Sequence, residues 1–197
     1  MKNTRLPLIA MSLCLSLAGC VSSPPPRFYV LAPLSTERPV DAGTEIAVGV
    51  GPVELPDYLD RQQIVTRSGQ NELKLAEFDR WGESLRDNAA QVLAENLAVL
   101  LPSKKISTYP WRRSAQVAYQ VTVKVTRFDH TEGGETVLGA RWSILDGAGA
   151  ELLTRESRYV ESPAGDSYPA TVAAMNRALA QFSREVANAI NGLKAGG

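Results

Sequence analysis

The residue with the clearest chemistry in this 197-residue chain is Cys20, because of what precedes it. Lys2 and Arg5 make a charged start, residues 6–17 form an apolar run, and Leu-Ala-Gly stands directly before the cysteine. This order is typical of a secretory signal, and the apolar run is shorter than the roughly twenty residues of a membrane span. A cysteine at that point resembles the bacterial lipobox. The Cys20 thiol would then receive diacylglycerol, the chain would be cut before it, and the freed amine would be acylated.

Acylation of Cys20 would tie the protein to a membrane. One acyl chain of ~14 carbons binds a bilayer marginally, but each buried methylene adds ~0.8 kcal/mol, so three chains, palmitate among them, hold essentially permanently. Residue 21 is valine, whereas aspartate after the cysteine retains lipoproteins in the inner membrane. We therefore expect a lipid-anchored protein on the periplasmic face of the outer membrane. The expected division is a signal peptide at 1–19, a lipidated cysteine with a proline-rich tether at 20–27, and one domain at 28–197.

Export changes the charge and the cysteine count. Loss of Lys2 and Arg5 lowers the 21 basic residues to 19 against 21 acidic ones, a net charge near −2. A nearly neutral chain lacks the basic stripe typical of nucleic-acid binding, so we expect no nucleic-acid partner. Cys14 leaves with the signal and Cys20 is consumed by lipid, so no disulfide is expected. Stability must then come from an ordinary hydrophobic core.

No other set of residues has the spacing of a catalytic or metal site. Gly165-Asp166-Ser167 faintly resembles a hydrolase nucleophile motif, but a serine nucleophile needs a base, and His130 is the one histidine. We expect Asp166 or Ser167 to cap the last helix instead. A single histidine without a free cysteine also argues against zinc. The sequence predicts no enzyme activity, no catalytic residues, no metal, and no cofactor beyond the acyl groups on Cys20.

The elements that must position any site are a mixture of strands and helices. Alternation of apolar and polar residues predicts strands, and apolar residues at steps of three and four predict two long amphipathic helices. The predicted strands cover 28–31, 46–50, 63–67, 72–76, 106–109, 117–128, 137–145 and 151–160, and the helices lie within 79–100 and 169–191. Gly51-Pro52 is expected to interrupt its strand, and Asp79 to cap the first helix. We expect an α+β fold, a mixed, mainly antiparallel sheet with both helices packed on one face.

Two short segments place aromatic and apolar side chains beside charges. Tyr58 and Leu59 follow a proline, and Trp81 closes a Phe-Asp-Arg-Trp segment before the predicted helix. Exposed aromatic side chains are frequent anchors of protein interfaces, so Tyr58, Leu59 and Trp81 are candidate interface residues. The alternative is that these three side chains simply close the end of the core.

Several segments together resemble the ABC-type transport auxiliary lipoprotein family. They are the lipobox at Cys20, the aromatic strand at 28–31, the block 58–67, the segment 78–81, the helix residues 92–97, and Pro110-Trp111. The block 58–67 with Trp81 at its downstream distance is the most specific. The resemblance implies a non-enzymatic component of a lipid transport machine, whose partner is the MCE-domain protein of the same transport system, which builds a tunnel across the periplasm. It also implies a homo-oligomeric ring that receives the tip of that tunnel at the outer membrane.

Two other interpretations stay open at this point. A monomeric lipid-binding shuttle would hold an apolar cavity between the sheet and the helices, although a permanent anchor and a short tether oppose that role. A structural envelope or assembly lipoprotein would need no transport partner.

Overall fold

Eight strands and two α-helices make up the protein in the computed structural model, which describes residues 23–35, 46–101, 103, 105–111 and 117–196. The strands are β1 (Arg27–Tyr29), β2 (Val48–Glu54), β3 (Gln63–Arg67), β4 (Leu73–Trp81), β5 (Ile106–Thr108), β6 (Tyr119–Thr131), β7 (Thr136–Asp146) and β8 (Glu151–Glu161). The helices are α2 (Leu85–Leu100) and α3 (Tyr168–Gly196), and the short 3-10 turn η1 (Asp57–Leu59) lies between β2 and β3.

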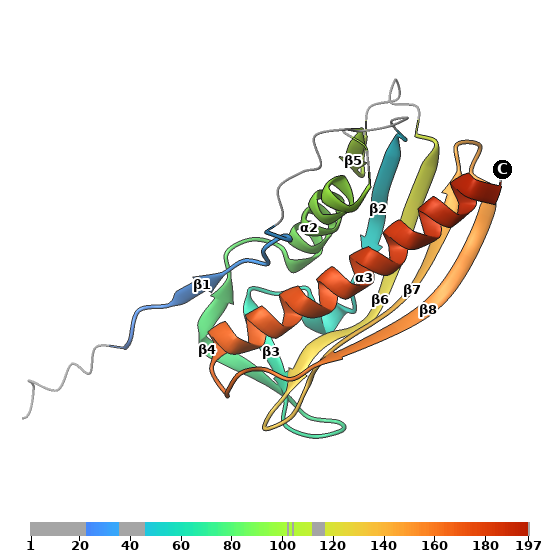
Figure 1. Ribbon diagram of the computed structural model, residues 1–197. Coiled ribbons are helices and arrows are strands. Elements are labelled where there is room, and N and C mark those ends of the chain that lie inside the picture. Colours follow the sequence, from blue (N-terminus) through green and yellow to red (C-terminus); the bar gives the residue numbers. More distant parts are fainter. Residues whose placement is uncertain (1–22, 36–45, 102, 104, 112–116, 197) are drawn as a thin grey trace, which may run out of the picture.

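The strands form one mixed sheet, and both helices lie on the same side of it (Figure 1). The order is β1-β4-β3-β6-β2-β5; β7 lies on the other edge of β6, and β8 follows β7. The longest ladders, β6–β7 and β7–β8, are antiparallel. Shorter parallel pairs join β1 to β4, β2 to β5 and β6, and β3 to β6. The expected α+β class with a mixed, mainly antiparallel sheet is confirmed, although the strand alternation did not predict the parallel pairs.

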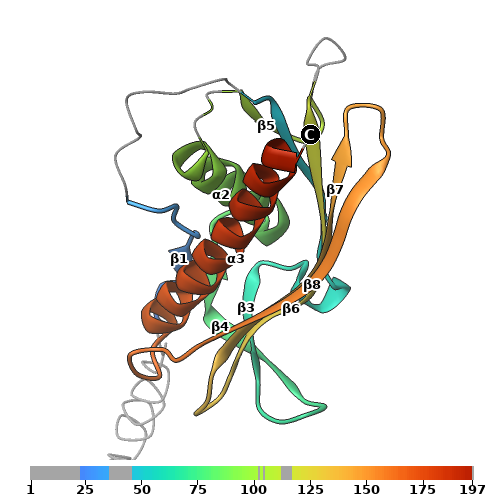
Figure 2. The same cartoon turned by 45° about the vertical axis from the view of Figure 1, so that its right-hand side comes forward.

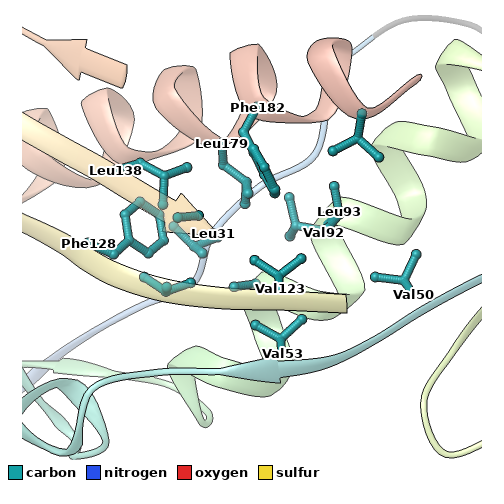
Figure 3. Close-up of a cluster of buried hydrophobic side chains, with 14 of the residues drawn as sticks. Leu31, Val50, Val53, Val92, Leu93, Val123, Phe128, Leu138, Leu179 and Phe182 are labelled. Atoms are coloured by element: carbon teal, nitrogen blue, oxygen red, sulfur yellow. The ribbon is translucent and has the colours of Figure 1, made fainter. Parts of the chain in front are cut away.

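The core fills the space between the sheet and the helices (Figure 3). Val123 and Phe128 of β6 point toward Leu93 of α2 and Phe182 of α3. Trp142 of β7 packs edge-on against Phe182, with ring centroids 5.9 Å apart. Each such side chain contributes about 1.5–3 kcal/mol when it leaves water. The sheet therefore has one covered face and one face turned away from the helices, which we call the open face.

Helix α2 begins later than the sequence predicts. Ser84 is its N-cap residue, and the Ser84 hydroxyl accepts a hydrogen bond from the backbone N–H of Asp87 at 3.4 Å. Asp79 belongs to β4 and accepts hydrogen bonds from side chains of β1, so the expectation that Asp79 caps the helix is wrong. The aromatic residues Phe78 and Trp81 favour a strand at this point, and the helix follows only after Gly82.

Helix α3 has the expected cap and a longer end. The backbone N–H of Ala170 donates to the Ser167 hydroxyl at 3.4 Å, which confirms the predicted role of Ser167. The helix continues beyond residue 191 to Gly196.

Two bulges change which residues face the helices. The sequence predicted an interruption at Gly51-Pro52, but β2 continues through both residues to Glu54. The strand accommodates them with a bulge, a shift of its register with β6 between Val50 and Val53. Gly51 has φ +118°, a backbone conformation that glycine adopts readily. In β6 a second shift falls between Val125 and Arg127, so that Phe128 points into the core and Asp129 points to the open face.

Candidate functional site

Cys20 lies outside the described residues, so its acylation stays a prediction. The described chain begins at Ser23, and Arg27 opens β1 seven residues after the cysteine (Figure 1). An extended chain spans at most ~3.3–3.6 Å per residue, so β1 lies within roughly 25 Å of Cys20. β1 is thus the point where a membrane anchor would join the folded body.

A buried carboxylate joins β1 to its neighbour. The Tyr29 hydroxyl donates to Asp79 Oδ1 at 2.7 Å, and Arg27 Nη2 donates to Asp79 Oδ2 at 2.9 Å. Asp79 is buried, whereas the Arg27 side chain is largely exposed. Burial, and then the bond to Asp79, raise the pKa of the Tyr29 hydroxyl above its usual value. Tyr29 therefore acts as a neutral donor that holds β1 against β4.

Beyond β1 the chain is fixed by side-chain amides. Three asparagines accept hydrogen bonds from the backbone N–H groups that follow the strand: Asn88 from Leu31 at 2.6 Å, Asn96 from Leu34 at 2.7 Å, and Asn176 from Ala32 at 3.1 Å. Asn96 is buried, and its Nδ2 also donates to the Ser183 hydroxyl of α3 at 3.0 Å. The segment after the anchor strand is therefore bonded to both helices at once.

The open face carries a buried charge cluster centred on Asp129. This side chain is 0% exposed and accepts hydrogen bonds from Tyr58 Oη at 2.7 Å, Arg67 Nε at 3.0 Å and Arg127 Nε at 2.8 Å. Arg67 also lies over the Tyr58 ring, with Cζ 5.2 Å from the centroid. Burial, followed by the bond to Asp129, raises the pKa of Tyr58 to about 12. The cluster fixes η1 on the open face and leaves one net positive charge there.

The structure separates the three candidate interface residues. Leu59 and Trp81 are 2% and 4% exposed and belong to the core, which is the alternative that the sequence left open. Tyr58 is partly buried and packs against that core with its hydroxyl on Asp129. Of the three, only Tyr58 is placed to touch a partner without the core opening, and its interface role stays a prediction.

Sequence reasoning missed Asp129 as the partner of Tyr58, and Arg127 as a further partner of Asp129. Arg67 closes the block that carries the family resemblance, but Asp129 lies 62 residues further along the chain. Only the bulge in β6 brings the Asp129 carboxylate to the open face. The one available signal is a charged residue at the end of an otherwise alternating strand.

The structure gives His130 and Ser167 separate structural roles. His130 is buried with Nδ1 3.4 Å from Thr136 Oγ1, and burial lowers the pKa of its ring, which favours the neutral form. Ser167 caps α3, as described above. His130 and Asp166 line a recess of about 380 Å³ at the start of α3. Within the described ranges, no three His, Cys, Asp or Glu side chains gather closely enough to hold a metal ion.

Larger recesses lie on the surface. One of about 640 Å³ lies between β8 and the C-terminal half of α3, lined by Leu153, Tyr159 and Leu193 among others. A second of about 550 Å³ adjoins Tyr109 and Pro110. None of the helices in the described part of the chain has both the length and the apolar character needed to cross a membrane.

Comparison with known proteins identifies the class to which this fold belongs. Residues 29–187 match the family of the ABC-type transport auxiliary lipoprotein component, and the chain belongs to that family. It is similar to the intermembrane transport lipoprotein PqiC of Escherichia coli K12, with 26% identity over 180 residues that cover 90% of this chain and 93% of PqiC. PqiC of Shigella flexneri matches to the same extent.

Two crystal structures share the fold. Protein XCC0632 from Xanthomonas campestris matches with a TM-score of 0.71 and 15% identity, over 86% of this chain and 98% of its own. An uncharacterized protein matches with a TM-score of 0.71 and 20% identity, over 85% of this chain and 99% of its own. At these identities the likeness shows the fold alone.

Proposed function

We propose that this protein is a lipid-anchored, non-enzymatic component of an intermembrane lipid transport system. In this proposal it lies on the periplasmic face of the outer membrane and docks the trans-periplasmic MCE-domain protein of the same system. The observation that carries the proposal is the similarity to the intermembrane transport lipoprotein PqiC over nearly the whole of both chains. The lipobox at Cys20 supports the lipid anchor, and the valine at position 21 supports its location in the outer membrane.

The attachment of the anchor strand supports a stationary role. β1 begins within roughly 25 Å of Cys20, a reach too short for a domain that carries cargo between membranes. Asp79 and the three asparagines bond the segment around β1 to β4 and to both helices. An anchor joined so firmly to the body fixes its position at the membrane surface.

The packed core supports a docking protein over a lipid shuttle. Phe128, Phe182 and Leu93 fill the space between the sheet and the helices, where a shuttle would need its cavity (Figure 3). The recesses described above are open to solvent, so one copy encloses no lipid within the part of the chain that the structure describes. We propose that lipid passes along or between copies, in a homo-oligomeric ring.

Crosslinking tests the docking partner. A photo-reactive amino acid placed at Tyr58 of the lipidated protein, in its own host, should crosslink to the MCE-domain protein, identified by mass spectrometry. The same amino acid at Leu152, an exposed position on β8, is the second position, so that the two crosslinks show which side of the molecule the partner contacts. Failure to crosslink any MCE-domain protein from exposed positions around the molecule, with the lipoprotein in the outer-membrane fraction, would overturn the docking role.

Light scattering tests the ring. The detergent-solubilised lipoprotein, corrected for bound detergent, should have a mass several times that of one mature chain, which lacks residues 1–19 of the 21.3 kDa precursor. A monomer both in detergent and in vesicles would contradict the ring and leave a monomeric adaptor.

Substitution of the lipobox cysteine tests the anchor. Cys20→Ala should leave a folded protein without envelope function, because three acyl chains at ~0.8 kcal/mol per buried methylene are lost. Cys14→Ala, in the apolar run of the signal, is the matched control and should leave anchoring intact. A Cys20→Ala strain that still supports envelope function would contradict the need for the anchor.

A further inference from the structure

Two exposed apolar side chains, one on β1 and one directly after it, follow the tether. Phe28 is 62% exposed and Val30 is 52% exposed. Tyr29, between them, points to Asp79 on the covered face, so Phe28 and Val30 share the open face. A Cβ at Gly82 would lie 3.3 Å from Val30 Cγ1, so the glycine leaves Val30 without a covering side chain. Single exposed apolar residues are ordinary, but two neighbours on one face form a small apolar surface.

Arg80, whose Nε has no hydrogen-bond partner among the described residues, lies beside Phe28. Arg80 of β4 is opposite Phe28 in the parallel pair, so both side chains project from the open face. Arg80 Nε is buried without a hydrogen-bond partner among the described residues. Arg27, Arg67 and Arg127 each contact a carboxylate at 2.8–3.0 Å, a partner that Arg80 lacks in the same part of the chain. A guanidinium presents a planar fork of donors that suits the oxygens of a phosphate.

The tether decides what covers this surface, which we call the β1 patch (Phe28, Val30 and Arg80). Residues 24–26 are three prolines, which favour an extended chain of about 3.1 Å per residue. An acylated Cys20 places the start of this tether in the lipid head groups. The start of β1 therefore lies within roughly 25 Å of the head-group layer, and the β1 patch within roughly 35 Å of it. Aromatic and basic side chains are the ones that favour this layer, with aromatic rings at head-group level and basic groups on phosphates.

We propose that the β1 patch rests on the bilayer that holds Cys20, with Phe28 and Val30 in the head-group layer and Arg80 bound to a phospholipid phosphate. The inference rests on the lipid anchor of the proposed function and adds which side of the body faces the membrane. β1 and β8 lie at opposite edges of the sheet (Figure 2). Contact through β1 leaves β8 and the C-terminal half of α3 directed away from the lipid, where a protein partner has access.

The mature lipoprotein offers a clean way to test this orientation. Export removes Cys14 and acylation consumes Cys20, so an introduced cysteine is the single free thiol. Spin labels are attached to the variants Phe28→Cys and Val30→Cys, with Leu152→Cys and Val160→Cys on β8 as matched exposed apolar positions. The full lipoproteins are reconstituted into vesicles of phosphatidylethanolamine and phosphatidylglycerol. Collision with a water-soluble relaxant and with oxygen is then measured at each label.

Labels at 28 and 30 should collide several-fold less with the water-soluble relaxant, and more with oxygen, than labels at 152 and 160. Equal accessibility at all four positions would overturn the proposal. The same labels in Cys14→Ala/Cys20→Ala protein, exported with a signal peptide that is cleaved without acylation, separate lipid cover from protein cover. Without the anchor, the labels at 28 and 30 should become accessible to the water-soluble relaxant, because the protein no longer rests on the bilayer. Labels that stay shielded without the anchor would show that a second copy or another protein covers the β1 patch, which also overturns the proposal.

Arg80 is tested in the same vesicles. Arg80→Gln in the Phe28→Cys variant should raise collision of the label with the water-soluble relaxant. Arg158→Gln, an exposed arginine of β8, should not change it. An unchanged Phe28→Cys label in the Arg80→Gln variant would remove Arg80 from the lipid contact. If the labels at 28 and 30 are shielded but no MCE-domain protein crosslinks, the docking role is overturned and the membrane contact stands. If the mass of the intact protein shows that Cys20 is not acylated, both the proposed function and the membrane contact are overturned.

Discussion

The strands at opposite edges of the sheet, β1 and β8, are each held by a tyrosine hydroxyl on a carboxylate, yet they are built differently. Tyr29 of β1 donates to Asp79 of β4, and Tyr159 of β8 donates to Glu185 of α3. β1 has three residues, whereas β8 has eleven and pairs with β7 along nearly all of them. For β8 the tyrosine adds to a long ladder, but for β1 it supplies a large share of the attachment.

This difference shows how a short strand can still be a firm attachment point. The strand beside the tether is held by a few buried polar contacts, each to a different element. The cost of an unpaired buried group is larger than the net gain of a typical hydrogen bond, so each of these contacts is individually important. The edge beside the tether should therefore be sensitive to single substitutions, and the β8 edge tolerant of them.

The largest expected effect is at Asn96. Asn96→Ala leaves the Leu34 N–H without its acceptor and removes a buried link to Ser183, which should cost about 2–3 kcal/mol. For a chain of this size, the melting temperature should fall by roughly 5–10 °C, measured by calorimetry. Asn176→Ala, which removes an exposed bond of the same kind, should cost less than ~1 kcal/mol. Equal losses from the two variants would contradict the importance of burial here.

Asp79 comes next. Asp79→Asn weakens the acceptor for Tyr29 and removes the charge that pairs with Arg27, which should cost about 1–2 kcal/mol in denaturant unfolding. Backbone hydrogen exchange in β1 should accelerate before that of the rest of the sheet. Glu185→Gln makes the corresponding change at the β8 edge and should leave exchange along β8 nearly unchanged. A larger acceleration of exchange in β8 by Glu185→Gln than in β1 by Asp79→Asn would show that the β8 edge is the more sensitive one.

Alkaline pH should weaken both edges. Burial, and then the bonds to Asp79 and Glu185, raise the pKa values of Tyr29 and Tyr159, so both stay neutral in the folded protein. The unfolded chain loses these protons near pH ~10, so their stabilisation is complete below that pH and is lost as the pH rises above it. Unfolding free energy measured from pH 8 to 12 should fall, and Tyr29→Phe and Tyr159→Phe should each make the fall shallower.

Tyr58 extends this test to the open face. Its pKa of about 12 means that its contribution declines between pH ~10, where the unfolded chain titrates, and about 12. Tyr58→Phe should therefore flatten the decline over that interval. Tyr109→Phe, which removes an exposed tyrosine, is the matched control. The same slope in the wild type and in Tyr58→Phe would show that the Asp129 bond does not hold the hydroxyl neutral.

The smallest change in stability is expected for an exposed ion pair between β7 and β8. Arg141 and Glu156 face each other across β7 and β8 at 3.9 Å, and both side chains are largely exposed. Such pairs contribute ~0–1 kcal/mol, so Glu156→Gln should change the unfolding free energy by less than ~0.5 kcal/mol. A loss as large as that of Asp79→Asn would show that the β8 edge does not tolerate change better than the β1 edge.

The sequence predicted the elements whose apolar periodicity is regular. Val121, Val123 and Val125 of β6, and Leu179 and Phe182 of α3, are buried on the faces that their spacing indicates. The start of α2 was wrong because an acidic residue before a helical pattern is typical of a cap, while the aromatic neighbours of Asp79 favour a strand. Local pattern cannot show that Asp79 accepts a hydrogen bond from the hydroxyl of Tyr29, which lies 50 residues earlier on another strand.

The candidate site was predictable only in part. The block 58–67 was recognised as distinctive, and the buried cluster shows a physical reason, since Tyr58 and Arg67 both bond Asp129. Leu59 and Trp81 have the composition of interface anchors, but the same apolar character buries them in the core. Arg80 beside Phe28 was not predictable, because their proximity depends on a parallel pairing between segments 52 residues apart.

The direction of β1 has a mechanical consequence. β1 and β4 run parallel, and the tether leaves from the N-terminal end of β1 (Figure 1). Tension on the acyl chains therefore acts along the strand axis and loads the hydrogen bonds of the pair in shear, all together, instead of unzipping them singly from one end. Force that passes beyond the strand enters α2 and α3 through Asn88, Asn96 and Asn176. A membrane that moves relative to a docked partner thus pulls on the whole body of the protein and not on a peelable edge.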